Sequence, residues 1–424
     1  MRKRVVITGL GVVSPNGVGL DAFTNALKNG SSGIRHSKVL EELQFSCQVA
    51  GEPIISDLMK EEYLTRLQLR GFNSTGILYG VIAGIDAFKD AGLKINADEV
   101  DWDMSIIFGA GTSGIDKFRE AIYKVDEKNV RRLGSSVAIQ VMNSGVSAYL
   151  SGILGAGGQV TTNSSACTTG AESILMGYDL IQSGRATKVL TGSTSDSGPY
   201  IWGGFDAMKV CAYKFNDQPE KASRPMSESA NGFVPGSGAG ALMLETLDSA
   251  LERGATIYAE LLGGHVNCGA QRNGGSLTAP NNEAVQRCIK TAVKNAGINA
   301  QDISTINGHL TATKKDSIEV QNWKEALEFT KDNFPPINSL KSLVGHGLSA
   351  SGALESVASV LQIKEQFVFP NANCEDIHPD IEAMINSTSV PTKMKELDVD
   401  IVAKASFGFG DVNGCLIFKR YNHS

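Results

Sequence analysis

The sequence lacks a long apolar segment and any closely spaced pair of cysteines. Residues 75–92 come closest to a membrane span, but Asp86, Lys89 and Asp90 interrupt them, so we expect a buried helix and no membrane partner. The 7 cysteines are odd in number, widely spaced and without a CxxC pair. This pattern disfavours a disulfide framework and a metal site, and it favours reduced thiols in a cytoplasmic protein.

Motifs of several common enzyme classes are also missing. There is no P-loop GK[ST], no HExxH and no GxSxG serine elbow. Gly9-Leu10-Gly11 resembles the start of a dinucleotide fingerprint, but Pro15-Asn16-Gly17 forms a turn where that fingerprint requires a helix. A nicotinamide-dependent oxidoreductase is therefore disfavoured. The net charge of −6 argues against nucleic acid as the main partner.

Aromatic residues make up only 7% of the chain, whereas glycine occurs 46 times, which indicates close backbone packing and many tight turns. Short β-prone runs alternate with helical stretches along the whole length. We expect strands at residues 5–8, 105–108, 189–191, 241–244 and 415–418, and helices such as 171–182 and 283–296 between them. This alternation predicts an α/β protein built of layers.

A weak internal repeat refines the predicted fold. Residues 236–245 and 408–418 are each a glycine-rich turn followed by a strand. A helix of small residues begins at Cys167, about 70 residues before the first turn, and another begins at His346, at a similar distance before the second. We therefore expect two halves of like topology, 1–250 and 251–424, with Cys167 facing His346 across a pseudo-two-fold axis.

Cys167 has the most informative surroundings of the cysteines. It lies among small residues, after the β-prone run 159–162 and before a helix-forming run that starts at Ala171. A thiol at such a junction lies near free backbone N–H groups and the positive end of a helix dipole, both of which stabilise a thiolate. Taken alone, however, a cysteine in a run of small residues is more often structural than catalytic.

Two later segments contain the other candidate site residues. His309 ends a strand-like run and could donate a hydrogen bond to an oxyanion or enolate, while Thr311 and Thr313 could bind an amide-rich substrate arm. The alternative is a loop histidine followed by threonines that form turns. Lys341, His346 and Glu355 form the second set.

Lys341, His346 and Glu355 are ionisable residues in an otherwise small and apolar segment. Buried ionisable groups are unfavourable unless they are paired, which makes these three functional candidates. Helix capping and a purely structural salt bridge are the alternatives. A cysteine combined with two histidines indicates acyl-thioester chemistry rather than metal binding.

With these residues, the chain resembles the β-ketoacyl-[acyl-carrier-protein] synthases of the elongating type, which are thiolase-fold condensing enzymes. The resemblance extends over nearly the whole sequence. It implies duplicated α/β/α/β/α layers in two pseudo-symmetric halves. The segments that carry it are 5–17, 165–170, 223–225, 232–234, 236–240, 309–316, 341–346 and 407–410.

The resemblance also implies roles for individual residues. Cys167 would accept the acyl group, with the backbone N–H groups of Cys167 and Phe409 as the oxyanion hole and Phe409 as a gate. His309 and His346 would assist decarboxylation of a malonyl thioester and stabilise the enolate. Lys341 and Glu355 would form a supporting ion pair, and Thr311 and Thr313 would contact pantetheine.

Cofactor and partner follow from the same resemblance. No cofactor would be bound, because the substrate arrives on the 4'-phosphopantetheine of an acyl carrier protein. That partner is expected to be acidic, and Lys128, Arg131 and Arg132 match a basic patch of the family, although solvated surface charge is the alternative. The family implies a dimer, either homomeric or heteromeric. Looser docking candidates are Arg66, Arg70 and Lys214.

The chain departs from the family pattern at several positions. Leu310 stands where the family has glycine, and we expect it to add bulk beside the pantetheine tunnel. Asp411 replaces a glycine in the gating loop. A further group replaces charged residues of the family and favours a specialised pathway, such as polyketide or aryl-polyene assembly, over a housekeeping role. That group is Ser227, Ala230, Asn231 and Ser237.

Two other functions compete with the condensing enzyme. A non-catalytic subunit that sets chain length in a heterodimer usually lacks the nucleophile, so Cys167 and both histidines argue against it. A degradative thiolase pairs its nucleophile with a second late cysteine, and neither Cys374 nor Cys415 has a suitable setting. The acyl chain that is extended does not follow from the sequence.

Overall fold

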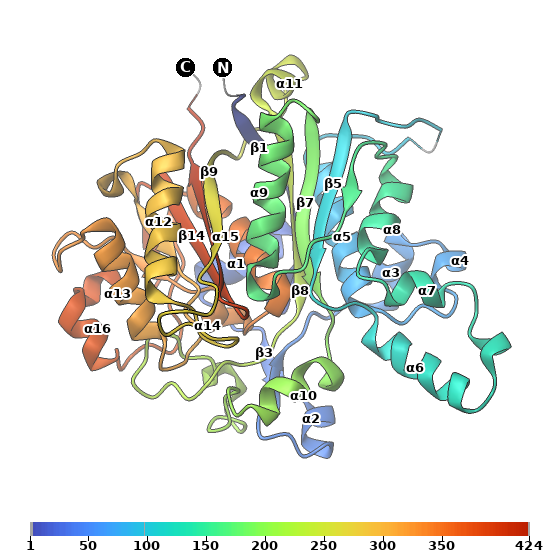
Figure 1. The fold of residues 1–424 in the computed structure, drawn as a ribbon, viewed down its shortest axis with the longest axis horizontal. Coiled ribbons are helices and arrows are strands. Elements are labelled where there is room, and N and C mark those ends of the chain that lie inside the picture. The colour runs from blue at the N-terminus through green and yellow to red at the C-terminus, as the bar shows by residue number, and fades with distance from the viewer. Residues whose placement is uncertain (1–2, 97, 423–424) are drawn as a thin grey trace.

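The protein is described by a computed structural model that covers residues 3–96 and 98–422. Its helices and strands form five layers, in which helices alternate with sheets (Figure 1). Each half contributes one sheet and one outer helical layer, and the two central helices lie between the sheets. The predicted α/β architecture with duplicated layers is therefore confirmed.

Five strands of each half form a mixed sheet with the same pairing pattern. Pairing of β1 with β9 joins the two into one sheet, to which β2 (Gly17–Val18) adds an eleventh strand. The first sheet has the order β6-β5-β7-β8-β1, and the second has the order β11-β10-β14-β15-β9. In both, the first three strands are parallel and the last two pair antiparallel. The first five strands are β1 (Val5–Ser14), β5 (Met104–Ala110), β6 (Val160–Thr161), β7 (Lys188–Ser195) and β8 (Gly238–Thr246); the second five are β9 (Ala259–Cys268), β10 (Thr305–Asn307), β11 (Ile337–Asn338), β14 (Ile401–Gly408) and β15 (Val412–Lys419).

The two sheets join at one edge. β1 pairs antiparallel with β9, from Val5 opposite Leu261 to Ile7 opposite Ala259. The strand that opens each half therefore lies next to the equivalent strand of the other half, as expected for a duplication. The predicted boundary after residue 250 falls within α11 (Leu247–Glu252), the short helix that leads toward β9.

The central layer consists of α9 (Thr169–Gln182) and α15 (Ser351–Glu365). In α15, 13 of the 15 residues are buried, which fits a helix covered on all sides. The outer helix α12 (Asn282–Ala296) instead buries only one stripe, Ala284, Val285, Cys288, Ile289, Ala292 and Val293. Its remaining positions face solvent, which is the pattern of an outer layer.

Three hydrophobic clusters correspond to the spaces between these layers. One fills the central layer between the sheets, one lies under α5 (Thr75–Asp90) and α8 (Gly145–Leu154), and one lies under α12 and α13 (Asp316–Leu327). The stretch 75–92, which the sequence analysis assigned to a buried helix, is thus α5. No helix within the described residues is long and apolar enough to cross a membrane.

The central helices touch through equivalent glycines. Gly170 and Gly352 are each the second residue of their helix, and a Cβ added to Gly352 would lie 2.6 Å from the backbone N of Ala171 and 3.0 Å from the Cα of Gly170. Only glycine permits backbones to approach so closely. This contact brings the starts of α9 and α15 together, as the sequence predicted.

The remaining elements cap the layers. The α6 helix protrudes from the first half as an arm, whereas α2, β3 and α10 lie below the sheets (Figure 1). These elements are β2 (Gly17–Val18), α1 (Leu20–Asn29), β3 (Ile34–His36), α2 (Lys38–Glu42), β4 (Val49–Gly51), α3 (Asp57–Tyr63), α4 (Arg66–Leu69), α6 (Ile115–Asp126), α7 (Val137–Val141), α10 (Pro199–Ala207), α14 (Lys341–Val344), β12 (Phe367–Val368), α16 (Pro379–Met384) and β13 (Lys395–Glu396).

Candidate active site

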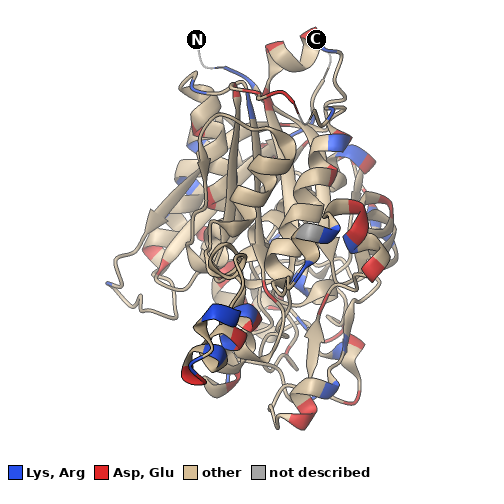
Figure 2. Cartoon of the chain, turned by 90° about the vertical axis from the view of Figure 1, so that its right-hand side faces the viewer, with Lys and Arg blue, Asp and Glu red and all other residues tan. Residues whose placement is uncertain are grey.

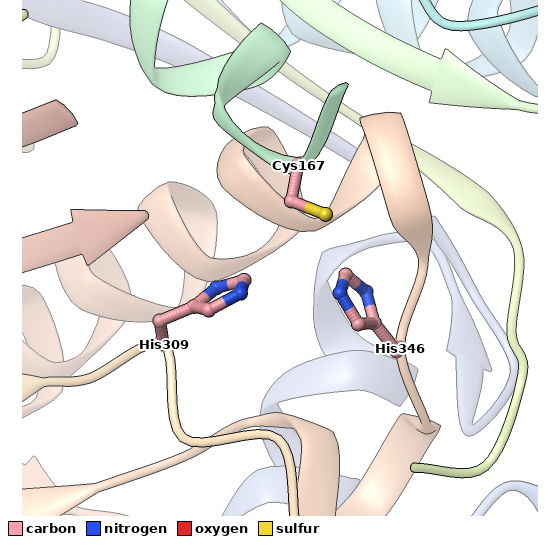
Figure 3. Close-up of side chains that lie close together, drawn as sticks. All are labelled: Cys167, His309 and His346. Atoms are coloured by element: carbon pink, nitrogen blue, oxygen red, sulfur yellow. The ribbon is translucent and has the colours of Figure 1, made fainter. Parts of the chain in front are cut away.

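Three predicted side chains converge at the starts of the central helices. Cys167 comes from the turn before α9, His309 from the loop after β10, and His346 from the loop before α15, and both imidazole rings point toward the thiol (Figure 3). One ligand-type atom of each lies within 4.8 Å of the other two. Residues separated by up to 179 positions in the chain thus form one cluster.

Cys167 lies in a 3-10 turn, Ala166–Thr168, that leads directly into α9. Ala166 has a φ of 49°, and Leu348 at the equivalent position before α15 has a φ of 52°, so the two halves enter their central helices through the same strained turn. The turn points the Cys167 side chain away from α9 and toward the histidines. The duplicated fold therefore determines where the thiol lies.

The protonation state of Cys167 is set by two opposed effects. Backbone N–H groups and Lys341 favour the thiolate, but burial opposes it more strongly and raises the pKa of the Cys167 thiol to about 11. The backbone groups thus favour the thiolate, as the sequence predicted, but they do not outweigh burial. The thiol is neutral at rest, and reaction requires that its proton be taken up as the acyl group arrives.

The backbone N–H groups of Phe409 and Cys167 both act on the Cys167 sulfur and lower the pKa of its thiol. Phe409 follows β14 in a glycine-rich loop, and a Cβ added to Gly408 would lie 3.1 Å from the backbone N of Cys167. Two N–H donors directed at one point next to the nucleophile provide the geometry of an oxyanion hole.

His346 has a defined tautomer. The backbone N–H of Leu348 donates to His346 Nδ1 at 3.0 Å, and the Ser351 hydroxyl lies 3.0 Å from the same nitrogen. Because Nδ1 accepts a backbone hydrogen bond, the proton of the neutral ring resides on Nε2. His346 therefore presents an N–H donor to the site.

His309 is held through its backbone. The N–H groups of His309 and Leu310 both donate to the Glu319 carboxylate at 2.7 Å, which fixes the loop after β10. The rings of His309 and His346 are 5.4 Å apart and edge-to-face. Burial lowers the pKa of both histidines well below the usual value, and the charges of Lys341 and Lys404 act in the same direction. Both rings are therefore neutral.

A buried group of three charges lies beside the histidines. Lys341 forms an ion pair with Glu355 Oε1, as predicted, and Lys404 binds Glu355 Oε2 at 2.9 Å. None of the three side chains is more than 2% exposed. Sequence analysis did not identify Lys404. The available indication was a lone lysine in the apolar strand 401–408. It lies two residues before Ser406 and on the same face as Gly408.

A cavity of about 390 Å³ leads from the surface to Cys167. Its wall includes both histidines, Phe409, and the predicted threonines Thr311 and Thr313, whose hydroxyl oxygens are 3.1 Å apart. The wall combines apolar side chains with hydroxyl and amide groups, including Thr278 and Asn282, which suits a polar arm that carries a reactive thioester.

The expectation for Leu310 is wrong. Its side chain is fully buried and packs in the cluster beneath α12 and α13, away from the cavity wall. The backbone turns after His309, which directs Leu310 toward the outer core. The larger side chain therefore fills the core and leaves the cavity unobstructed.

The charge-removing substitutions are accompanied by new partners. Ser227 donates to Asp376, which also accepts from Arg224 Nη2 at 3.1 Å, and Glu375 accepts from the same nitrogen at 2.7 Å. Residues 375–376 thus supply the carboxylates that balance Arg224. Ser237 forms a 2.5 Å hydroxyl–hydroxyl hydrogen bond with Ser197.

Asp411 ties the loop of Phe409 to a neighbouring segment. Its φ of 64° is the left-handed conformation that glycine tolerates, and its carboxylate accepts from the backbone N–H groups of Gln271 at 2.9 Å and Asn281 at 2.8 Å. Gly410 N–H also donates to the carbonyl of Leu277 at 2.8 Å. The Phe409 loop is therefore anchored at several points.

Lys128, Arg131 and Arg132, the basic residues predicted to dock a partner, are exposed at the end of the α6 arm. Figure 2 faces the side of the molecule on which this arm lies and shows Lys and Arg mixed with Asp and Glu along it. The three residues therefore form a local basic group rather than part of a large positive face. Arg66, Arg70 and Lys214 are exposed as well.

Cysteine and histidine are common zinc ligands, so this cluster has the side chains of a metal site. Lys341 and Lys404 both act on the histidines as positive charges. A divalent cation among Cys167, His309 and His346 would be repelled by both ammonium groups. The donor set is therefore better suited to stabilising anions than to holding a metal ion.

Comparisons with known proteins agree with this geometry. The family model of the β-ketoacyl synthase N-terminal domain matches residues 2–250, and that of the C-terminal domain matches residues 258–375. The 3-oxoacyl-[acyl-carrier-protein] synthase 2 of Vibrio harveyi is 32% identical over 423 residues, which cover 99% of both proteins.

Two solved structures are similar over the whole chain. The ishigamide ketosynthase/chain length factor has a TM-score of 0.88 at 28% identity and covers 100% of both chains. A type II polyketide synthase acyl-carrier protein in complex with its ketosynthase bound to the hexaketide gives 0.87 at 26% identity, over 99% of this chain and 100% of that chain. The chain therefore belongs to the β-ketoacyl synthase family.

Proposed function

We propose that this protein is a 3-oxoacyl-[acyl-carrier-protein] synthase that catalyses a decarboxylative Claisen condensation. The observation that carries the proposal is the convergence of Cys167, His309 and His346 within 4.8 Å at the end of a cavity lined by Thr311 and Thr313. A thiol that accepts the acyl group divides the difficult carbon–carbon bond formation into two easier steps.

In the first step, Cys167 attacks the acyl thioester of the carrier protein. The new S–C bond forms as the bond to the pantetheine sulfur breaks, and the thiol proton leaves with the released carrier thiol. The tetrahedral oxyanion accepts hydrogen bonds from the N–H groups of Cys167 and Phe409. Thr311 and Thr313 hold the amide-rich pantetheine arm in the cavity.

In the second step, malonyl-carrier protein occupies the same cavity and loses CO₂. The electron pair of the broken C–C bond becomes a thioester enolate, whose oxygen accepts hydrogen bonds from His309 and from Nε2–H of His346. The enolate carbon attacks the acyl-Cys167 carbonyl and expels the sulfur. Neutral histidines suit this step because a donor is needed and a strong base is not.

The competing functions have less support. A degradative thiolase needs a second cysteine in the site, but Cys374 and Cys415 are both buried in the outer core of the second half. A chain-length subunit without catalysis has no use for the nucleophile, and Cys167 is retained with both histidines beside it. A housekeeping or a specialised pathway is compatible with the proposed reaction.

The acidic carrier protein docks, on this proposal, at Lys128, Arg131 and Arg132, and the chain acts as a dimer in the cytoplasm. All seven cysteines are unpaired, which supports a reducing compartment. β6 is the last strand of its sheet, and Val160 on that strand and Met142 nearby are exposed. An open edge with apolar neighbours favours pairing with a second chain. We also propose the division into halves near residue 250.

The test combines intact-protein mass spectrometry with a condensation assay. Wild-type protein is incubated with a panel of acyl-carrier proteins, and we expect one acyl adduct and a 3-oxoacyl product after malonyl-carrier protein is added. Cys167→Ala abolishes both, whereas Cys268→Ala, which removes an exposed cysteine, changes neither. Condensation retained by Cys167→Ala, or no acylation with any donor, overturns the proposal.

A further inference from the structure

Lys404 is a charged side chain near the active site that the proposed reaction does not use. It is fully buried on β14, where Val402, Ser406 and Gly408 share its face of the strand. Its neighbour in register on β10 is Asn307, two residues before His309. Lys404 therefore lies beside the strand that leads to His309 and five residues before Phe409. This position allows it to act on the site.

The contacts of Lys404 connect it to the charged group. Its ammonium binds Glu355 Oε2 at 2.9 Å and donates to the Ser406 hydroxyl, while Lys341 occupies the other carboxylate oxygen. A buried carboxylate with two ammonium partners leaves one positive charge without a counterion. Burial of such a net charge is unfavourable, so its retention calls for a function.

The charges of this group act on titratable side chains from several neighbouring elements. Lys341 and Lys404 oppose protonation of His309 and His346, and Lys341 and Glu355 have opposite effects on the Cys167 thiol. The facing groups are Lys341 on α14, Glu355 on α15, Glu319 on α13, Cys415 on β15, Cys167 before α9, and the two histidines.

We propose that Lys404 is a positioning residue that neutralises Glu355, so that Lys341 remains a net positive charge directed at Cys167 and the two histidines. Two anions form beside this charge during the proposed reaction. They are the thiolate of Cys167 and the enolate next to the histidines. Without Lys404, Glu355 would cancel Lys341 and the site would present no net charge.

This proposal rests on the proposed function, but its first measurement needs no substrate and therefore tests Lys404 separately. The rate of alkylation of Cys167 by iodoacetamide at about pH 8.5 reports the thiolate fraction without any substrate. In Lys404→Met, the thiol becomes harder to ionise, and we expect about tenfold slower alkylation, which corresponds to a shift of about one pKa unit.

The double variant Lys404→Met/Glu355→Gln separates charge from packing. It removes one positive and one negative charge, so Lys341 again provides the net charge, and we expect faster alkylation than in Lys404→Met alone. A structural role predicts the opposite order, because two changes in one buried cluster disturb it more than one. Lys404→Met keeps Glu355 paired with Lys341, so the single variant buries no unpaired carboxylate and its alkylation rate can be read even if the double variant unfolds.

Lys117→Met is the matched control. Lys117 is another buried lysine, held by the carbonyl of Gly71 at 2.6 Å and by Glu120 at 2.9 Å on the α6 arm. Its loss removes a buried ammonium of the same kind without changing the charge at the site. We expect wild-type alkylation of Cys167 in this variant, with folding of all variants checked by circular dichroism.

The second measurement is the pH profile of malonyl-carrier decarboxylation. Removing Lys404 makes the histidines easier to protonate, so the acid limb moves to higher pH by about one unit. Wild-type protein that decarboxylates nothing contradicts the proposed function alone. Wild-type rates and an unmoved acid limb in Lys404→Met, or a double variant that alkylates no faster than Lys404→Met, contradict the role of Lys404.

Discussion

The contact between α9 and α15 is the feature on which the site depends most directly, and Gly352→Ala perturbs it. A Cβ at Gly352 would lie 2.6 Å from the backbone N of Ala171, and 3.0 and 3.1 Å from the Cα and C of Gly170. Comfortable contacts between such atoms are about 3.5–4.0 Å. All three neighbours are backbone atoms, so relief requires the two helices to separate.

The expected loss of stability follows from two opposed effects. Alanine in place of glycine favours a helix by about 0.5–1 kcal/mol. Overpacking a tightly packed core costs about 1–3 kcal/mol. The overlap with rigid backbone puts Gly352→Ala toward the upper part of that range, so we expect a net loss of about 1–2 kcal/mol in the free energy of unfolding.

The same separation moves His346 away from Cys167. A misplacement of about 1 Å between reacting groups can lower a rate about 100-fold. Gly352→Ala should therefore lose far more condensing activity than its stability explains at a temperature where it remains folded. The measurements are urea unfolding, for the free energy and m-value, and the turnover number with saturating acyl- and malonyl-carrier proteins.

Gly152→Ala is the control, because α8 offers a helical glycine with no atom within 4 Å of the added Cβ. It should be neutral or slightly more stable than the wild type, with unchanged turnover. The reasoning is refuted if Gly352→Ala unfolds at the same urea concentration as Gly152→Ala and turns over at the wild-type rate.

Three further predictions follow from the site. Because the pKa of the Cys167 thiol is raised to about 11, its alkylation should accelerate about tenfold per pH unit between about pH 7 and 10; a plateau below pH 9 in the measured rates would contradict this. Asp411→Gly keeps the left-handed backbone but deprives two backbone N–H groups of their acceptor. It should lower the free energy of unfolding by about 1–3 kcal/mol and speed hydrogen exchange in residues 269–281. Unchanged exchange there argues against the anchoring. Arg131→Glu/Arg132→Glu should raise the KM for carrier protein in a salt-dependent way while Cys167 alkylates normally, and an unchanged KM would remove this patch as the docking site.

The layered fold and the three converging residues could be predicted because each left a mark in the local sequence. The expected strands and helices are found in β1, β5, β7, β8, β15, α9 and α12, since their apolar periodicity and turn residues agree with their tertiary setting. The internal repeat predicted that Cys167 and His346 face each other, because it implies two halves that pair. No single motif contains that information.

Three features of the site could not be predicted from the sequence because they depend on residues that are distant in the chain. The local backbone at Cys167 favours a thiolate, but the burial that reverses this comes from the second half of the chain. Leu310 points into the core because the chain turns after His309. Lys404 was missed because a lysine in a strand is usually exposed, and only the position of Glu355 on α15 makes it internal.

The duplication also indicates what Glu355 and Lys404 do, because the equivalent positions of the first half carry uncharged residues. Ser173 on α9 and Thr191 on β7 occupy the positions equivalent to Glu355 on α15 and Lys404 on β14, and both pairs face the central layer. Ser173 donates to Asn163 at 2.6 Å, and Thr191 donates to the carbonyl of Leu242 at 3.0 Å. A symmetric fold would stand equally well with neutral pairs in both halves. Because buried charges are unfavourable, their presence only in the half that supplies the histidines indicates that they serve the shared site rather than the fold.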